Sequence, residues 1–258
     1  MHNFLARGIA KLLIYQLIIE NPVQPEKEKT MEELKNEFVK TINNSFNVEE
    51  KDISKIERIN TEKSIVYIAY SIQQENKFYD IDLNIPMINI KGNIPKEFNK
   101  VTQEVFVKKA NEVRKNKNNA EKIIYSIDYV GYLNDNILSI IIKSSLKQGN
   151  NPQRIIIQTY NYNIETKEKV SLNNIIEQKN INVQELQNKI NDVLKSVKKE
   201  ETILINSGYP VYERNLESEI YKTENITNFF LNEEGKLYIV FAYGNQNFTS
   251  EFDIVKYE

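Results

Sequence analysis

Few side chains in this chain of 258 residues are of the types that perform chemistry. Its one histidine, His2, stands beside the N-terminus, and there is no cysteine. A Ser-His-Asp triad, a cysteine nucleophile and zinc sites of histidine or thiolate are therefore excluded. The seven glycines stand singly, so no glycine-rich phosphate cradle can be written either.

Carboxylates remain as candidates. Asp80 and Asp82 lie two residues apart on an expected strand, so both project from one face. Such a pair can hold a divalent cation or act as acid and base, but it is also the normal polar face of an amphipathic strand. Two carboxylates supply too few oxygens for calcium. We expect no metal, no cofactor and no catalytic residue. The alternative is that the carboxylates are catalytic, in a carboxylate-dependent cell-wall hydrolase or an accessory domain of one.

Aromatic residues in expected loops are the candidates for recognition. Two tyrosines flank Pro210 in one loop, and further residues surround Gly244 in another. The predicted binding residues are Tyr209, Tyr212, Tyr243, Asn245 and Phe248. Exposed loop aromatics are typical of recognition surfaces, since they bring a large apolar area together with a polar tip. The competing interpretation is that these rings plug the ends of a sheet.

Charge and hydropathy limit the partners. A net charge of −2 argues against non-specific nucleic-acid binding, which needs a concentrated cationic surface. The apolar run 12–19 is far shorter than the roughly twenty residues of a membrane span, and no small-residue cleavage site follows it. We expect a buried or partner-packed helix there and no membrane span. The targeting segment of an exported protein would lie outside this sequence.

The hydropathy pattern groups helices and strands instead of alternating them strictly. Helical spacing predicts helices at 30–43, 95–113 and 182–197. Alternation predicts strands at 64–70, 78–85, 122–133, 137–146, 154–164, 227–231, 236–243 and 247–257. This order favours an α+β fold of antiparallel sheets, each packed by helices. In the helix at 95–113, we expect Phe98, Val101 and Val105 to face the sheet.

Three parts are expected along the chain. Residues 1–57 form an N-terminal helical segment and linker, 58–152 a first α+β subdomain, and 153–258 a C-terminal α+β subdomain. The alternation of the strands assigns most of their apolar residues to a core. We therefore expect any partner-binding surface on the loops of the C-terminal subdomain.

Several stretches resemble a known bacterial envelope module. They are 78–88, 129–146, 160–176, 228–241 and 252–254. The resemblance is to the extracytoplasmic module shared by the lysozyme-sensing anti-sigma factor RsiV and the non-catalytic N-terminal region of the peptidoglycan deacetylase PdaC. It covers roughly residues 60–257 and implies two consecutive subdomains, an envelope location and, in one branch, binding of lysozyme. No lysozyme-contacting residue can be carried over, and the deacetylase domain, the anti-sigma segment and the membrane span have no counterpart here.

From the residues and the resemblance together we expect a non-enzymatic ligand-binding or sensor module of the bacterial cell envelope. Its expected location is extracytoplasmic, and its expected partner is a protein, lysozyme-like, or a peptidoglycan-type glycan. The hydrolase alternative predicts a buried carboxylate pair in a cleft. A purely structural interaction protein would instead show a broad flat apolar patch.

Overall fold

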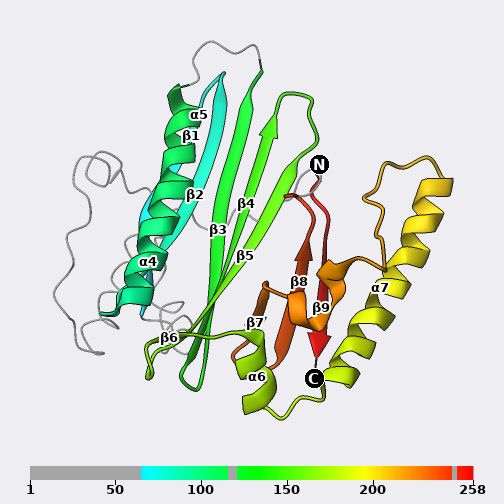
Figure 1. Cartoon of the computed structure of the whole chain (residues 1–258). Coiled ribbons are helices and arrows are strands. Elements are labelled where there is room, and N and C mark those ends of the chain that lie inside the picture. Colours follow the sequence, from blue (N-terminus) through cyan, green and yellow to red (C-terminus); the bar gives the residue numbers. More distant parts are fainter. Residues whose placement is uncertain (1–64, 116–120, 246–248, 258) are drawn as a thin grey trace, which may run out of the picture. The chain divides into compact units, whose positions relative to one another are not determined.

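A computed structural model of the chain describes residues 65–115, 121–245 and 249–257 (Figure 1). The expected helix at 30–43 and the segment 1–57 lie outside the described residues. The chain divides into two compact units, 1–131 with 147–150 and 132–146 with 151–258. The fold is α+β, as expected, with strands paired mainly antiparallel. The domain boundaries expected from the sequence stay a prediction.

The first unit contains a β-hairpin and a third strand that runs parallel to the second strand of the hairpin. Strands β1 (Val66–Glu75) and β2 (Tyr79–Ile88) pair antiparallel. Asn76 caps their turn, since its Oδ1 accepts from the N–H groups of Phe78 and Tyr79 at 2.8 and 3.0 Å. Strand β3 (Ile123–Asn134) pairs with β2 in parallel, which differs from the wholly antiparallel sheets expected. A parallel pair needs a crossover, and the helical segment between β2 and β3 supplies it.

That helical segment is interrupted by a π-helix. Its parts are α4 (Asn93–Thr102), the π-helix η2 (Gln103–Val107) and α5 (Lys108–Lys115). Pro95 lies in the first turn. Phe98 is buried, but the expectation was wrong for Val101 and Val105, which are 36% and 53% exposed. Val101 is exposed because the inward position of α4 after Phe98 is taken by Thr102, which is 1% exposed, and Val105 lies in the π turn itself. The buried apolar side chains are Phe106 and Val107 within η2 and Ala110 and Val113 in α5.

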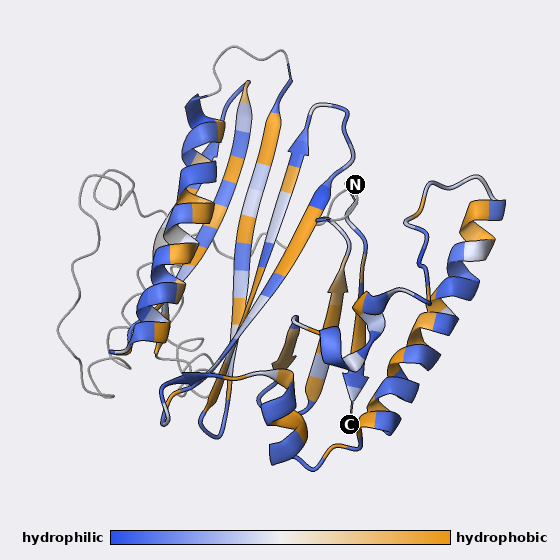
Figure 2. Ribbon diagram, viewed as in Figure 1, coloured by the Kyte–Doolittle hydropathy of each residue, from blue (hydrophilic) through white to orange (hydrophobic). Residues whose placement is uncertain are grey.

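The second unit contains two groups of strands. Strand β4 (Ile137–Gln148) pairs antiparallel with β5 (Arg154–Asn163), and β6 (Glu168–Lys169) pairs antiparallel with the end of β5. The three-stranded sheet has the order β7-β8-β9, with all pairs antiparallel. Its strands are β7 (Phe229–Leu231), β8 (Leu237–Ala242) and β9 (Phe252–Tyr257). Figure 2 shows hydrophobic and hydrophilic residues alternating along the strands, as half-buried sheets require.

Two α-helices and two short 3₁₀ turns complete the second unit. They are α6 (Leu172–Gln178), α7 (Val183–Asn206), η3 (Glu219–Tyr221) and η4 (Thr223–Asn225). Asn182 caps α7, because its Oδ1 accepts from the N–H groups of Gln184 and Glu185. The inward stripe of α7 joins the core of this unit, with Leu186, Ile190 and Leu194 almost fully buried.

Within the described residues, none of the helices is both long and apolar enough to cross a bilayer.

Candidate functional site

The C-terminal end of α7 carries a concentration of exposed apolar side chains. Ile203, Leu204 and Ile205 are 66%, 42% and 43% exposed, and Tyr209 just beyond is 62% exposed. This end of the helix diverges from β9 (Figure 1). Scattered apolar residues on a surface need no explanation, but a contiguous group is typical of an interaction site. We call Ile203–Ile205 together with Tyr209 the α7 tip.

The chain leaves α7 through a fixed cap that positions Tyr209. The N–H of Gly208 donates to the Ile205 carbonyl at 2.9 Å, and the N–H of Tyr209 donates to the Leu204 carbonyl at 3.0 Å. This is the Schellman arrangement, and it requires the left-handed backbone that Gly208 adopts at φ +83°. Tyr209 is therefore held in place by backbone hydrogen bonds, which lowers the entropic cost of presenting it.

Two predicted binding residues, Tyr212 and Tyr243, come together but face inward. Their rings stack with centroids 4.2 Å apart and an interplanar angle of 16°. Tyr212 is half-buried and Tyr243 is 1% exposed, so Tyr243 differs from the exposed ring expected beside Gly244. The hydroxyl of Tyr243 donates to Oδ2 of Asp253 at 2.5 Å and accepts from Tyr221 at 3.0 Å, which satisfies it inside the protein. The binding role of the pair stays a prediction.

The remaining predicted residues lie apart from this pair. Asn245 is exposed, and its Oδ1 accepts from Nη2 of Arg154 at 2.8 Å. Nε of Arg154 also donates to the carbonyl of Gly244 at 2.7 Å. A Cβ at Gly244 would clash with the carbonyl oxygen of Ile155, so this turn needs glycine. Phe248 lies outside the described residues.

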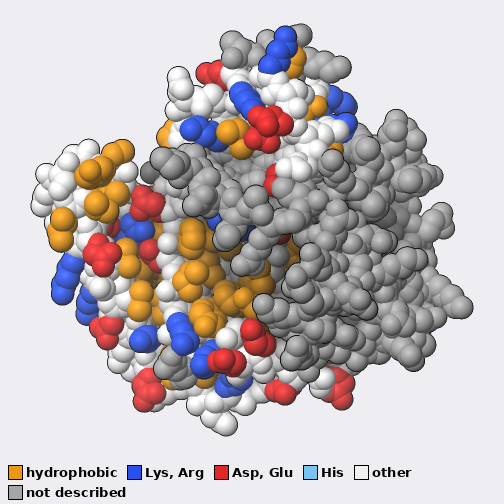
Figure 3. All heavy atoms as spheres, turned by 180° about the vertical axis from the view of Figure 1, so that it is seen from behind, with side chains coloured by type: hydrophobic (Ala, Val, Ile, Leu, Met, Phe, Trp, Pro, Cys, Tyr) orange, Lys and Arg blue, Asp and Glu red, His pale blue; other side chains and the backbone are white. Residues whose placement is uncertain are grey.

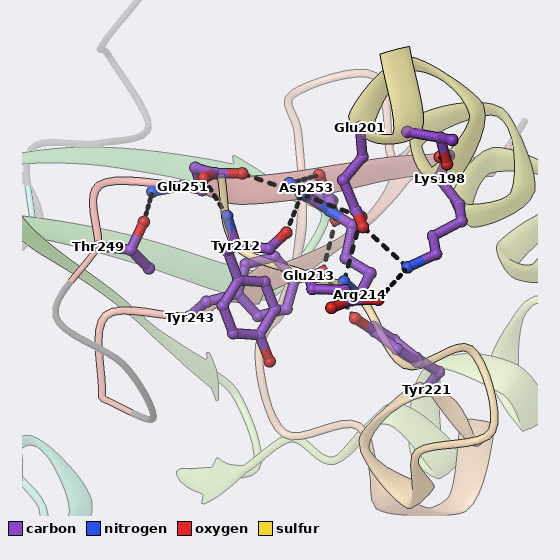
Figure 4. A network of polar contacts seen from close by, with 11 residues as sticks. Lys198, Glu201, Tyr212, Glu213, Arg214, Tyr221, Tyr243, Thr249, Glu251 and Asp253 are labelled. Carbon is purple, nitrogen blue, oxygen red and sulfur yellow. Dashed lines mark hydrogen bonds and ion pairs between the residues drawn. The ribbon is translucent and has the colours of Figure 1, made fainter. Parts of the chain in front are cut away.

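Arg214 stands at the centre of a buried network of charged groups (Figure 4). Its Nε and Nη2 donate to the two carboxylate oxygens of Asp253 at 2.8 and 3.0 Å. Its Nη1 donates to the Glu251 carboxylate and to the Tyr212 carbonyl, both at 2.9 Å. Its backbone N–H donates to Oε2 of Glu201 at 3.1 Å. One residue thus joins α7, the loop that follows it and β9.

A second cation completes the network on the side of α7. Nζ of Lys198 donates to Oε1 of Glu201 at 2.8 Å and to Oε1 of Glu213 at 3.3 Å. The network contains the carboxylates of Glu201, Glu213, Glu251 and Asp253 and the cations of Lys198 and Arg214. With four negative and two positive charges, the network has a net charge of −2. Its outer members give the nearby surface an acidic character.

The tyrosines and Arg214 have shifted pKa values. Burial opposes the charged form of Arg214, yet its hydrogen bonds and ion pair with Asp253 raise its pKa above the usual range. Burial raises the pKa of Tyr221 to about 12, and burial together with the hydrogen bond to Asp253 raises the pKa of Tyr243 further. These groups keep one protonation state across the physiological range. The arrangement is suited to holding the α7 tip and the loop in place.

The carboxylate pair considered from the sequence lies in the first unit. Asp80 and Asp82 share one face of β2, and both have a pKa raised above its usual value. Burial is the main cause for both, followed for Asp80 by Glu75 and for Asp82 by Asp128 and Asp80. Among the described residues, no group of three or more His, Cys, Asp or Glu side chains is arranged to hold a metal ion.

A groove runs between α7 and the segment that contains η3 and η4. Its volume is about 490 Å³, within the range of ligand-binding clefts. Polar side chains line both walls over a floor of Leu194, Leu216 and Tyr221. The polar lining comprises Gln187, Asn191, Lys195, Glu217, Ser218, Lys222 and Glu224. Gln187 ties the walls together, because it donates to the Tyr221 carbonyl and accepts from the N–H of Thr223.

Sequence reasoning missed the Arg214 network and the apolar part of the α7 tip. Glu201 carried a signal, since it lies seven residues after Leu194 and so falls on the inward stripe of α7. A carboxylate on such a stripe needs a buried cation. Arg214 itself follows no periodic pattern, and its partner Asp253 is 39 residues away in the chain.

Comparisons with known proteins give structural neighbours only. No family model matches the chain, and no curated protein does. A DUF3298 family protein from Pseudomonas aeruginosa PAO1 aligns with 71% of this chain and 83% of its own, at 11% identity and a TM-score of 0.42. A DUF3298 family member from Bacteroides fragilis NCTC 9343 aligns with 73% and 88%, at 12% identity and a TM-score of 0.37. At these scores the likeness carries no argument about function.

Proposed function

We propose that this chain is a non-enzymatic binding or sensor module of the bacterial cell envelope, and that it recognises a protein through the α7 tip. One observation carries the proposal: four exposed apolar side chains are grouped within seven residues. The Schellman cap and the Arg214 network, which fixes the loop beyond the cap, hold them in place. A rigid apolar and aromatic group loses little entropy on binding, which is the property of a binding anchor.

The envelope location and the kind of partner come from the resemblance of residues 60–257 to the RsiV and PdaC modules. A lysozyme-like protein is cationic, and the net charge of −2 in the network next to the tip would speed its encounter at low salt. The proposed partner is therefore a cationic envelope protein, and the proposed location is extracytoplasmic.

The test measures binding of the full chain to immobilised lysozyme and, separately, to envelope extract. The variants are Ile203→Ser and Tyr209→Ala, with Val183→Ser as the matched control, because Val183 is 50% exposed at the other end of the same helix. Both tip variants should weaken binding by about 2 kcal/mol, the size typical of a binding anchor, whereas the control should bind normally. Equal binding by all three proteins would remove the tip from the proposal.

A cell-wall glycan is the second partner considered, and the groove favours it. The amide of Asn191, the hydroxyl of Ser218 and the carboxylate of Glu217 are groups that hydrogen-bond to sugar hydroxyls. Titration with soluble peptidoglycan fragments should then show an affinity that falls in Asn191→Ala and is unchanged in Tyr209→Ala. The opposite pattern would assign the fragments to the tip.

A carboxylate-dependent hydrolase is the alternative function, favoured by the raised pKa values of Asp80 and Asp82. It predicts release of reducing sugar from peptidoglycan by the full chain and loss of that release in Asp82→Asn. If the full chain releases no reducing sugar from peptidoglycan, the hydrolase alternative is wrong and the binding module remains as the proposed function.

A further inference from the structure

The two edges of the β7-β8-β9 sheet differ in how their backbone groups are paired. In an antiparallel ladder, alternate residues direct both their N–H and C=O to the same neighbouring strand. On β9 the phase is set by the N–H of Tyr243, which donates to the carbonyl of Glu251 at 3.3 Å. Asp253, two residues after Glu251, therefore also directs its N–H and C=O to β8, where it is in register with Phe241. Phe252 and Ile254 therefore direct their backbone groups to the outer side.

The β7 edge is closed by side chains. The N–H of Val240 donates to the carbonyl of Asn228, so Phe229 and Leu231 direct their backbone groups away from β8. The N–H of Phe229 donates to Oγ1 of Thr159 at 3.0 Å, and its carbonyl accepts from Nδ2 of Asn161 at 2.8 Å. The N–H of Leu231 donates to Oγ of Ser139 at 3.1 Å. These bonds from β4 and β5 leave no template for another strand.

The β9 edge has no such closure in the part of the chain that the structure describes. No hydrogen bond satisfies the outward backbone groups of Phe252 or Ile254 there. Their side chains are 37% and 47% exposed, while those of Asp253 and Val255 point into the core. Figure 3 shows hydrophobic side chains reaching the surface among charged ones on the face drawn. An edge strand with free backbone groups and exposed apolar side chains is a template for strand addition.

We propose that β9 binds an extended peptide segment of a protein partner as an added antiparallel or parallel strand. The inference rests on the proposed binding function and names a second surface for it. The apolar side chains of the peptide lie beside Phe252 and Ile254. The alternate side chains reach the other face, where the carboxylates of Glu251 and Glu213 have 28% and 76% of their side-chain surface exposed. Those positions suit lysine or arginine.

The size of the edge selects a peptide over a second copy of this chain. Strand β9 has six residues, which span roughly 20 Å at about 3.4 Å per residue. A pairing of that length between two copies buries far less than the ~800 Å² per partner of a stable dimer. A short extended peptide needs only the backbone groups of Phe252 and Ile254 and the two acidic side chains.

The experiment follows backbone amide exchange in the full chain by NMR, with and without a short blocked peptide of alternating valine and lysine. In the free protein, the amides of Asp253 and Val255 should exchange slowly and those of Phe252 and Ile254 quickly. The peptide should slow the exchange of Phe252 and Ile254 at least tenfold. The same peptide with a central proline should not, because proline lacks the N–H that a ladder needs.

Two variants separate backbone pairing from other contacts. Ile254→Pro removes the outward N–H together with the isoleucine side chain and should abolish peptide protection, while Ile254→Thr also loses the isoleucine side chain but keeps the N–H and should retain protection. If Ile254→Pro fails to fold, the proposal is tested by amide exchange in the unmodified chain with and without the peptide. Protected amides at Phe252 and Ile254 in the free monomer would overturn the proposal. So would protection that rises with protein concentration alongside a doubled mass, which would assign the edge to a second copy.

A matched measurement distinguishes this proposal from the one on the α7 tip. Tyr209→Ala should leave peptide protection at β9 intact even if it loses the protein partner. If the peptide does not protect the β9 amides while lysozyme still binds, only the strand site is wrong. If the peptide protects them while lysozyme does not bind, only the proposal on the α7 tip is wrong.

Discussion

The backbone N–H and the guanidinium of Arg214 both reach the carboxylate of Glu201. The N–H donates to Oε2 at 3.1 Å, and Nη1 lies 3.7 Å from the same oxygen. Both side chains are nearly excluded from solvent, at 6% and 1% exposed. A buried carboxylate on the inward stripe of α7 thus fixes the start of the 212–216 loop, and through it the surface proposed for recognition.

Removal of Arg214 should be strongly destabilising. Arg214→Ala leaves Glu201 and Asp253 buried without their cation, so the free energy of unfolding should fall by about 3–5 kcal/mol. Urea denaturation followed by circular dichroism measures it. Lys222→Ala is the matched control, because it breaks an exposed pair with Glu219 and should change stability little. A small effect of Arg214→Ala would show that the network does not hold the loop.

Tyr243→Phe should weaken the second unit and alter its response to alkaline pH. The change removes a hydrogen bond to the Asp253 carboxylate, which costs about 1.5–3 kcal/mol at neutral pH. The folded-state pKa values of Tyr243 and Tyr221 lie above the usual value of 10. Their stabilisation is therefore complete below pH 10 and is lost as the pH rises through the folded pKa, about 12 for Tyr221.

The measurement is the urea midpoint between pH 8 and the onset of alkaline unfolding. The unmodified chain should lose stability above roughly pH 10, and Tyr243→Phe should lose it less steeply because one of the titrating groups is gone. Tyr209→Phe, at an exposed position, is the control. Identical slopes in all three proteins would contradict the assignment of the alkaline transition to the buried tyrosines.

Asp82→Asn should stabilise the first unit at neutral pH. Burial, followed by the charges of Asp128 and Asp80, raises the folded-state pKa of Asp82 above 3.8. Stability linked to this group is complete below the unfolded value and is lost as the pH rises through the folded one. The gain from asparagine should therefore be present at pH 7 and vanish towards pH 3.8. Glu97→Gln, at an exposed site on α4, is the control.

The sequence predicted the fold class and several local signals but not every pairing. The start of the helix near residue 182 and the strands around Tyr79 and Ile155 follow from short-range patterns, and the structure contains them. The parallel pairing of β2 with β3 could not be predicted, because alternation along one strand carries no information on the direction of its neighbour. That direction is set by the crossover, over 30 residues long.

The candidate site was predictable only in part, for a related reason. The exposed loop position of Tyr209 was predictable because proline and glycine mark loops, and its binding role stays a prediction. Tyr243 also stands beside a glycine, yet its ring is buried because Asp253 and Tyr221 satisfy its hydroxyl. Such partners come from distant strands and turns, so a local pattern cannot distinguish the two tyrosines.

The burial of the side chains in and around η2 gives the last prediction. The spacing expected from the sequence would bury Val105 with Phe98 and Val101, but Thr102, Phe106 and Val107 take the buried positions instead. Phe106→Ala should therefore lower the free energy of unfolding by about 3–5 kcal/mol, whereas Val105→Ala should change it by no more than about 0.5 kcal/mol. Thermal and urea unfolding of the two variants measure this difference. Equal losses, or a larger loss for Val105→Ala, would mean that Val105 faces the core in solution.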